Sequence, residues 1–390
     1  MTELPIKDKT AIVGVGWTEF TRNSGTSVAV LAARASLMAI EDAGLRVDDI
    51  DGVVSYFHKK NDTIHPRELA DMLGLPACNF HYFHDGGGSW NAAAVLSAAM
   101  MVHSGICTNV LVYNGRNRYS EGRAKRAENA FDTSGSEQFE APFGSHHAAA
   151  GFGQYATAHM ARYGTTTLDF AHLAVTQRKH ATLNNKAMMR KPITIEDHQN
   201  SRWIIYPFRL LDCCQETDGA VALVVTSADQ ARHLRHNPVY VMGGGCGRGG
   251  RDEGDSGATA ARVFASAGIS PLDVDIAEIY DNFTFMCMKH LADFGLAPQG
   301  EVGAWVREGR NGLDGDLPVN THGGLLSEAH FMGLNHVVEA VQQLWTEGVA
   351  DDLCDGPHTY DRSTCRQVRD PEIAFVCGVL GSSAVVLRKG

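Results

Sequence analysis

The stretch Ala43-Gly44-Leu45-Arg46-Val47-Asp48-Asp49-Ile50-Asp51 has a counterpart later in the chain. There, Ala267-Gly268-Ile269 is followed, at the same internal spacing, by Asp273-Val274-Asp275. Each copy comes after a stretch of helical period and before an apolar, strand-like run. A short pattern can repeat by chance, but the shared context indicates duplication of one α/β unit. The repeat therefore predicts a chain of two similar halves.

Apolar, β-branched runs alternate with Ala-rich stretches of helical period along the chain. This alternation is typical of βαβ units around a buried sheet. A glycine turn precedes a long helix twice, at residues 86–88 and at residues 323–324. The predicted strands are residues 10–15, 53–56, 110–114, 220–226 and 274–279, and the predicted helices are residues 27–43, 69–73, 91–103 and 335–344.

Strand character stops between about residues 119 and 207, in a polar segment rich in His, Arg and Gly. An insertion of this size usually covers a site instead of extending a sheet. We therefore predict an N-terminal half of residues 1–235, which includes the insertion, and a C-terminal half of residues 236–390.

The composition is that of a compact α/β protein, with 390 residues, 44% hydrophobic residues and 41 glycines. The formal net charge of -11 argues against nucleic acid as a partner, because phosphate binding needs clustered Lys and Arg. The first residues carry no apolar run of signal-peptide length, and no segment approaches the roughly 18 apolar residues of a membrane span. We expect a cytoplasmic protein that does not associate with a membrane.

The nine cysteines include no Cys-x-x-Cys pair. Their spacing implies neither a disulfide framework nor a structural zinc site. We expect most of them to be small buried hydrophobic residues, and we predict no metal site in this chain.

Several motifs resemble the thiolase superfamily, in particular its sterol-carrier-type branch. The run from Asn320 to His330, Asn-Thr-His-Gly-Gly-Leu-Leu-Ser-Glu-Ala-His, is similar to the thiolase stretch that begins Asn-Pro-Ser-Gly-Gly and ends Gly-His-Pro. The other motifs are His159-Met160-Ala161-Arg162-Tyr163-Gly164, Arg178-Lys179-His180-Ala181 and Asp212-Cys213-Cys214. The resemblance covers nearly the whole chain. It implies an α/β thiolase fold, in which two duplicated βαβαβ-type halves form five layers, α-β-α-β-α, with a large insertion.

The nucleophile of thiolases is missing from this sequence. Thiolases place a reactive Cys at the start of the helix after the first glycine turn, where the helix dipole favours a thiolate. Here that stretch reads His84-Asp85-Gly86-Gly87-Gly88-Ser89-Trp90. Asp85 lies about where the nucleophile is expected, and a carboxylate cannot perform thiolate acyl transfer in the same way. The resemblance therefore points away from ordinary thiolase chemistry.

Two positions of the thiolase site keep residues suited to proton transfer. His330 matches the histidine of the Gly-His-Pro motif, which helps to form the oxyanion hole and would stabilise a thioester enolate. Tyr280-Asp281-Asn282-Phe283 follows a predicted strand, and a Tyr at its first position is the mark of the thiolase-like steroid side-chain aldolases. Those enzymes carry a second Tyr where this chain has His330. The resemblance implies that Tyr280 transfers the proton and that Asn282 supports the enolate oxygen.

Structural roles are the alternatives for this pair. Tyr280 would then be a strand-end residue that packs on the sheet, and His330 a helix-start residue that bonds to the backbone.

The thiolase resemblance adds two further sets of candidate residues. Cys377-Gly378-Val379-Leu380-Gly381 resembles the C-terminal turn that supplies a second, acid–base cysteine, so Cys377 is a catalytic candidate. A buried turn cysteine is the alternative. In the second glycine turn, the resemblance implies that Gly323, Gly324 and Ser327 bind the coenzyme A part of the substrate.

Together these features predict a carbon–carbon lyase that cleaves a β-hydroxyacyl-CoA by a retro-aldol reaction. By resemblance, the substrate is a steroid side-chain CoA thioester, and the products are a ketosteroid and a short acyl-CoA such as propionyl-CoA. The resemblance also implies a homodimeric core and a small partner with an OB fold and a zinc ribbon, which form a heterotetramer. It implies no cofactor in this chain, with zinc in the partner. A thiolase-like acyltransferase and a non-catalytic thiolase-like subunit are the alternatives.

Overall fold

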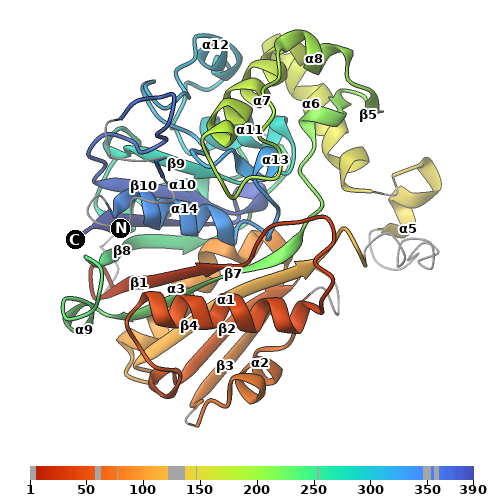
Figure 1. Cartoon of the computed structure of the whole chain (residues 1–390). Helices are drawn as coiled ribbons and strands as arrows, with labels where there is room; N and C mark the ends of the chain where they lie inside the picture. Colours follow the sequence, from red (N-terminus) through yellow and green to blue (C-terminus); the bar gives the residue numbers. More distant parts are fainter. Residues whose placement is uncertain are drawn as a thin grey trace.

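The computed structural model describes residues 6–57, 63–76, 78–121, 137–145, 147–252, 254–345, 353–354 and 360–390. Two similar α/β units lie one above the other in Figure 1, and a mainly helical insertion extends to one side. None of the helices in these ranges is long and apolar enough to cross a membrane.

The N-terminal unit alternates strands and helices as predicted. Its elements are β1 (Thr10–Trp17), α1 (Val28–Asp42), β2 (Gly52–Phe57), α2 (Pro66–Leu73), β3 (Phe80–Asp85), α3 (Asn91–His103), β4 (Asn109–Asn117) and β7 (Asp218–Ser227). Between β4 and β7 lies the insertion, with α5 (Glu137–Glu140), α6 (Ala148–Tyr163), α7 (Thr167–Thr182), α8 (Ile195–Asn200) and a hairpin of β5 (Trp203–Ile205) and β6 (Phe208–Arg209).

The C-terminal unit follows α9 (Ala228–Ala231). Its strands are β8 (Val239–Cys246), β9 (Ile276–Ile279), β10 (Ile373–Cys377) and β11 (Ser383–Lys389). Its helices are α10 (Gly257–Ala267), α11 (Thr284–Asp293), α12 (Val302–Arg307), α13 (Gly324–Ser327) and α14 (Leu334–Leu344).

The order of the strands in the sheet shows the same duplication. The nine-stranded sheet has the order β3-β2-β4-β7-β1-β8-β11-β10-β9. In the N-terminal unit β7 is antiparallel to β4 and β1, and in the C-terminal unit β11 is antiparallel to β10 and β8. Outward from the place where β1 and β8 pair, the order β1-β7-β4-β2 in one unit matches β8-β11-β10-β9 in the other, and β3 extends the N-terminal side. The boundary near residue 235 stays a prediction.

The repeated stretch has the same structural role in both units. Asp51 precedes β2, and its carboxylate accepts the backbone N–H of Asn109 at 3.0 Å, where β4 begins. Asp275 precedes β9, and its carboxylate accepts the N–H of Ile373 at 2.9 Å, where β10 begins. In each unit an aspartate therefore joins the start of one parallel strand to the start of its neighbour, which explains why the spacing recurs.

Two buried helices, α3 and α14, form the middle layer of the molecule. Both contact strands of the N-terminal and of the C-terminal unit, and one hydrophobic cluster includes side chains from all of these elements. The outer face of the N-terminal unit is covered by α1, and that of the C-terminal unit by α10. The predicted five-layer thiolase fold is confirmed, with one addition: β1 and β8 join the two sheets into one.

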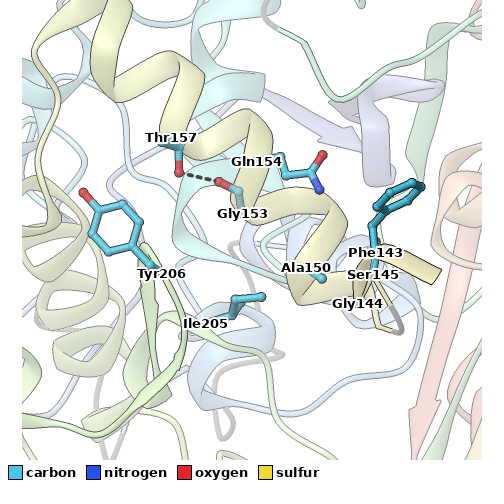
Figure 2. Close-up of a pocket in the computed structure, with 9 residues that line it drawn as sticks. All are labelled: Phe143, Gly144, Ser145, Ala150, Gly153, Gln154, Thr157, Ile205 and Tyr206. Atoms are coloured by element: carbon cyan, nitrogen blue, oxygen red, sulfur yellow. Dashed lines mark hydrogen bonds between the residues drawn. The ribbon is translucent and has the colours of Figure 1, made fainter. Parts of the chain in front are cut away.

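The insertion has a hollow between α6 and the β5–β6 hairpin, which Figure 2 shows. Its lining residues are Phe143, Gly144, Ser145, Ala150, Gly153, Gln154, Thr157, Ile205 and Tyr206. Neither Tyr280 nor His330 is among them, so this hollow is separate from the predicted catalytic pair.

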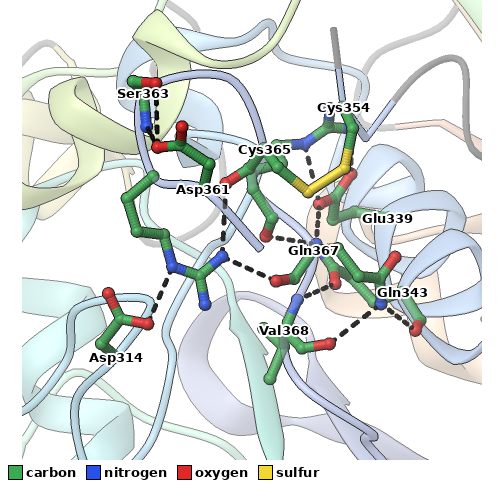
Figure 3. The surroundings of a disulfide bond; sticks show 11 residues. Asp314, Glu339, Gln343, Cys354, Asp361, Ser363, Cys365, Gln367 and Val368 are labelled. Carbon is green, nitrogen blue, oxygen red and sulfur yellow. Dashed lines mark hydrogen bonds and ion pairs between the residues drawn. A yellow bond between two sulfur atoms is a disulfide. The ribbon is translucent and has the colours of Figure 1, made fainter. Parts of the chain in front are cut away.

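Cys354 and Cys365 form a disulfide, shown in Figure 3 beside the buried end of α14. The cysteine spacing predicted no disulfide framework, and this single bond is a difference from that expectation. The two residues meet in an isolated β-bridge, which no spacing motif announces. The other cysteines are free, and Cys107, Cys287 and Cys377 are buried as expected.

Candidate active site

Tyr280 and His330 form the centre of the candidate site. Tyr280 directly follows β9, and His330 lies in the connection between α13 and α14. The Tyr280 hydroxyl oxygen is 2.9 Å from His330 Nε2, and the two rings meet edge to face. The predicted proton-transfer residue and the predicted enolate-stabilising residue are therefore hydrogen-bond partners.

The phenol of Tyr280 is enclosed by protein, and the residue is only 3% exposed. Gly88, in the turn before α3, packs so closely on the hydroxyl that a Cβ there would clash with it. Met332 Sδ lies 3.8 Å from the same oxygen. Burial raises the pKa of the Tyr280 phenol well above its usual value, and nearby Cys214 adds to the shift. At neutral pH the phenol keeps its proton and can donate it to His330.

His330 is half-buried and is held from two sides. Its backbone N–H donates to Thr217 Oγ1 at 2.9 Å, and its Nδ1 lies 3.5 Å from Cys214 Sγ. Burial raises the pKa of the Cys214 thiol to about 12, so the thiol is protonated at neutral pH. When Tyr280 donates to Nε2 of a neutral imidazole, the ring proton is on Nδ1 and faces the Cys214 sulfur.

Asn282 lies beside Cys214 and is buried. Its backbone carbonyl accepts the Cys214 N–H at 3.0 Å. Within the described ranges, the side-chain Oδ1 of Asn282 has no hydrogen-bond partner. A buried amide oxygen of this kind is suited to a substrate donor. Support of an enolate by Asn282 stays a prediction.

The other two catalytic candidates lie in different environments. Asp85 is exposed at the end of β3, whereas it is Gly88, three residues later, that faces the Tyr280 hydroxyl. Cys377 ends β10 and is fully buried, and burial raises the pKa of its thiol to about 12. The buried environment of Cys377 favours a structural role for this residue, because a protonated thiol is a weak nucleophile and a weak base.

The predicted coenzyme A residues lie at the start and at the end of the short helix α13. Gly323, Gly324 and Ser327 are all buried. Gly324 packs against the Asp281 carboxylate, which accepts the N–H groups at the start of α13. Ser327 Oγ accepts a hydrogen bond from Arg178 Nε at 2.9 Å, which ties α13 to α7. Binding of coenzyme A by these residues stays a prediction.

Two neighbours of the pair were not predicted as site residues. Cys214 belongs to a motif that carries the family resemblance, but its contact with His330 joins positions 116 residues apart. Gly88 was predicted only as part of a turn. Its position in that turn was the available signal, because a helix-opening glycine without a side chain lets another chain segment approach closely.

The arrangement is that of a thiolase superfamily member whose glycine turn presents no cysteine. The thiolase C-terminal domain-like family matches residues 254–356. The structure of human mitochondrial 3-ketoacyl-CoA thiolase shares the fold, with a TM-score of 0.69, 12% identity, and 99% of this chain and 100% of that chain covered. Within this class, the chain belongs to the thiolase-like steroid side-chain-cleaving aldolases, because two proteins of that kind are 39–40% identical to it over most of both chains. It is therefore a carbon–carbon lyase, as the sequence predicted.

Two relatives and one solved structure support this assignment. The 17-hydroxy-3-oxo-4-pregnene-20-carboxyl-CoA lyase of Mycobacterium tuberculosis is 40% identical, over 87% of this chain and 92% of that protein. The steroid side-chain-cleaving aldolase of Thermomonospora curvata is 39% identical, over 85% of this chain and 89% of that protein. The Ltp2-ChsH2(DUF35) aldolase structure has a TM-score of 0.87 and 34% identity, and 98% of each chain is covered.

Proposed function

We propose that this chain cleaves a β-hydroxyacyl-CoA with a steroid side chain, and releases a ketosteroid and a short acyl-CoA such as propionyl-CoA. The observation that carries the proposal is the 2.9 Å contact between the Tyr280 hydroxyl and His330 Nε2. The name of the Mycobacterium relative supports the substrate class, because a 17-hydroxyl group and a thioester carboxyl on carbon 20 make that relative's substrate a β-hydroxy thioester.

The geometry of the pair supports a proton relay. The substrate hydroxyl gives its proton to the Tyr280 oxygen while the phenol gives its own proton to His330 Nε2, which leaves Tyr280 neutral and His330 as an imidazolium. The electron pair of the former O–H bond forms the ketone, and the carbon–carbon bond breaks to give a thioester enolate. Return of the proton from His330 through Tyr280 to the α-carbon completes the acyl-CoA product.

This relay needs no free phenolate before the substrate binds. A buried phenol with a raised pKa is a poor base by itself. A neutral His330 imidazole in hydrogen-bond contact can accept the phenol proton of Tyr280 while the phenol oxygen takes a proton from the substrate. The imidazolium formed then lies beside the developing enolate, where positive charge lowers the barrier. Tyr280 and His330 thus act together both as the base and as the stabiliser of the enolate. The Asn282 amide is a further hydrogen-bond donor to the enolate oxygen.

We also propose that the active form is an assembly. The related aldolase structure is that of Ltp2 with ChsH2, a DUF35 protein, which supports a DUF35 partner for this chain. The finer form of the proposal is a homodimeric core with two small OB-fold and zinc-ribbon partners, in which zinc belongs to the partner and none is needed as a cofactor here. Gly323, Gly324 and Ser327 would border the coenzyme A.

The test is Tyr280→Phe in the chain co-purified with its natural partner. With a steroid β-hydroxyacyl-CoA, we expect loss of ketosteroid formation and an unchanged circular dichroism spectrum, since only the proton-carrying oxygen is removed. Tyr113→Phe is the matched control, because that buried phenol bonds to the Ile64 carbonyl at 2.7 Å, away from the pair. Turnover within about threefold of wild type in the folded Tyr280 variant would overturn the proposal.

A further inference from the structure

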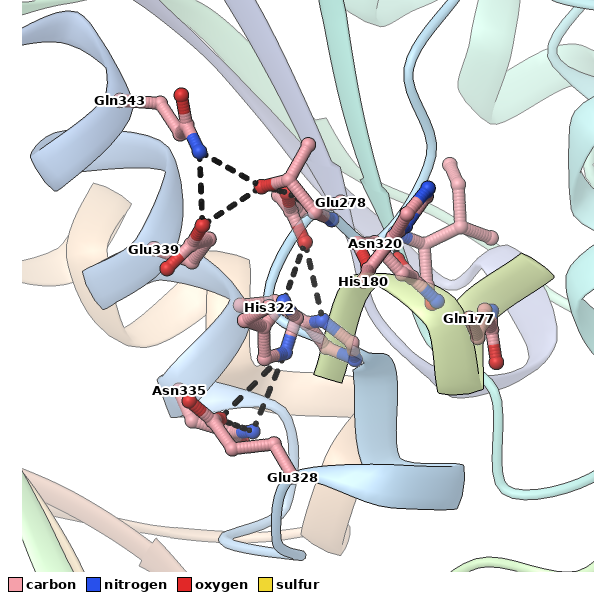
Figure 4. Close-up of polar contacts among 12 residues, drawn as sticks. Gln177, His180, Glu278, Asn320, His322, Glu328, Asn335, Glu339 and Gln343 are labelled. Carbon is pink, nitrogen blue, oxygen red and sulfur yellow. Dashed lines mark hydrogen bonds and ion pairs between the residues drawn. The ribbon is translucent and has the colours of Figure 1, made fainter. Parts of the chain in front are cut away.

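A cluster of three buried side chains lies directly behind the catalytic pair. Glu278 is on β9, His322 is in the loop before α13, and His336 is on α14. All three are fully buried. Glu278 Oε2 is 2.9 Å from His322 Nδ1 and 3.6 Å from His336 Nδ1, and the three atoms lie within 4.8 Å of one another. Figure 4 shows the contact of Glu278 with His322.

These short distances are not hydrogen bonds of normal geometry. In the part of the chain that the structure describes, Glu278 Oε2, His322 Nδ1 and His336 Nδ1 have no hydrogen-bond partner. The contact of Glu278 with His322 therefore lacks the alignment of a hydrogen bond, and its contact with His336 is too long for one. Three unsatisfied polar atoms in one buried place are costly, because each has given up its contact with water.

A metal ion between the three atoms accounts for this geometry. A histidine that ligates an ion directs its ring nitrogen at the ion, and a neighbouring ligand oxygen then lies to one side of that direction. With metal–ligand bonds of about 2.0–2.2 Å, neighbouring ligands of a tetrahedral ion are about 3.4 Å apart. The two distances from Glu278 Oε2 lie on either side of this value.

The far nitrogen of each ring lies near a buried carboxylate. His322 Nε2 is 3.6 Å from Glu328 Oε2, and His336 Nε2 is 3.3 Å from Asp281 Oδ1. A ligating histidine usually places its second ring N–H against a carboxylate or carbonyl, which fixes the tautomer and makes the ligating nitrogen more basic. An ion bound here would require both histidines to be neutral, with the lone pair on Nδ1 directed at the ion.

The charge of the region also favours a divalent cation. Glu278, Asp281 and Glu328 are buried carboxylates, and every ion pair recorded for them among the described residues is with one of these two histidines. A divalent cation between the two rings would supply a counter-charge to these three carboxylates, which a protein interior otherwise disfavours.

We propose that Glu278 Oε2, His322 Nδ1 and His336 Nδ1 bind one divalent metal ion of the zinc class. Two imidazole nitrogens and one carboxylate oxygen are a donor set that zinc prefers, with water as the fourth ligand. The ion joins β9, the loop before α13 and α14. Because Tyr280 is two residues beyond Glu278 and its ring lies 6.2 Å from that of His336, the site supports the catalytic pair from behind without taking part in the reaction.

The test is the metal content of the full chain. The chain is produced without a partner, in medium with added zinc, and is dialysed against metal-free buffer before elemental analysis. We expect about one zinc ion per folded wild-type chain, and at least a tenfold lower content in Glu278→Gln and His336→Gln. The control is His290→Gln, which removes another fully buried histidine that is not one of the three ligands. This control should keep the metal.

A second measurement covers variants that fail to fold. Zinc should raise the melting temperature of the wild-type chain relative to the same chain unfolded and refolded with a chelator. Co²⁺ in place of zinc should give the visible absorption of a tetrahedral nitrogen and oxygen site. A folded wild-type chain without metal, and without a zinc-dependent melting temperature, would mean that both histidines are protonated and would overturn the proposal. Metal retained in both ligand variants would overturn it equally.

Discussion

At the residue scale, the proposed chemistry of this protein depends on the contact between a tyrosine and a histidine. Tyr280 and His330 are 50 positions apart, and each was predicted separately by its resemblance to a thiolase motif. The sequence could not indicate that one ring donates to the other, because that contact depends on how the loop before α14 packs on the end of β9. The contact makes the proposed role of each residue depend on its neighbour.

His330→Ala should lower turnover by about 100-fold or more, because it removes both the acceptor of the Tyr280 proton and the charge that stabilises the enolate. The measurement is the rate of ketosteroid formation under saturating substrate. His330→Gln retains a side chain that can accept a hydrogen bond but cannot become a cation. Equal losses in both variants would support the imidazolium role, whereas near-normal turnover in either would contradict it.

Cys377→Ala should leave turnover within about threefold of wild type, because its buried thiol has a pKa of about 12 and stays protonated at neutral pH. The side chain fills space at the end of β10, so we expect a loss of stability of about 1–2 kcal/mol. Turnover and melting temperature should be measured together. A folded variant without activity, or an acyl group on Cys377 found by mass spectrometry, would favour the acyltransferase alternative instead.

At the element scale, the turn before α3 decides how Tyr280 is placed. A thiolase uses this turn to present a nucleophile, whereas here Gly88 leaves room for the Tyr280 hydroxyl. The sequence correctly indicated that the turn lacks a cysteine. The sequence also suggested that Asp85 takes the place of the nucleophile, but Asp85 is exposed. The sequence of a turn does not specify which of its residues faces inward.

Gly88→Ala should therefore lower turnover by about 100-fold, since a Cβ at this position clashes with the Tyr280 phenol and displacement of a reacting group by about 1 Å can cost that much. Gly257→Ala, at the start of α10, is the matched control, because a Cβ there meets no other atom within 4 Å. Both rates should be compared with the melting temperatures of the variants. Normal turnover in Gly88→Ala would show that the turn does not position Tyr280.

At the scale of the whole molecule, α14 joins the two units and is fixed by a buried ion pair. Glu339 Oε2 accepts a hydrogen bond from Arg366 Nη2 at 2.9 Å, and both side chains are almost completely buried. Burial alone would raise the pKa of the Glu339 carboxyl, but the Arg366 guanidinium holds it well below its usual range. The pair links the middle layer to the segment that leads into β10.

Arg366→Met should destabilise the protein by about 3–5 kcal/mol, because it leaves a buried carboxylate without a counter-charge. The exposed pair Arg232–Asp229 offers a control, and Arg232→Met should cost less than about 1 kcal/mol. Thermal unfolding of the two variants gives the comparison. If Arg366→Met and Arg232→Met have similar melting temperatures, the Glu339 carboxylate must bind another partner or become protonated without loss of stability.

The amino-acid sequence alone was enough to predict the duplicated α/β fold, the family and the loss of the thiolase cysteine. These properties are written in local patterns: the repeat before β2 and β9, the glycine turns, and the motifs around Tyr280 and His330. Which side chains contact one another became visible only in the folded chain. Contacts between distant segments include the hydrogen bond of the proposed catalytic pair, the approach of Gly88 and Cys214 to that pair, the Cys354–Cys365 bond and the cluster behind Tyr280. Such contacts follow from how buried elements pack, and periodicity along the chain does not encode them.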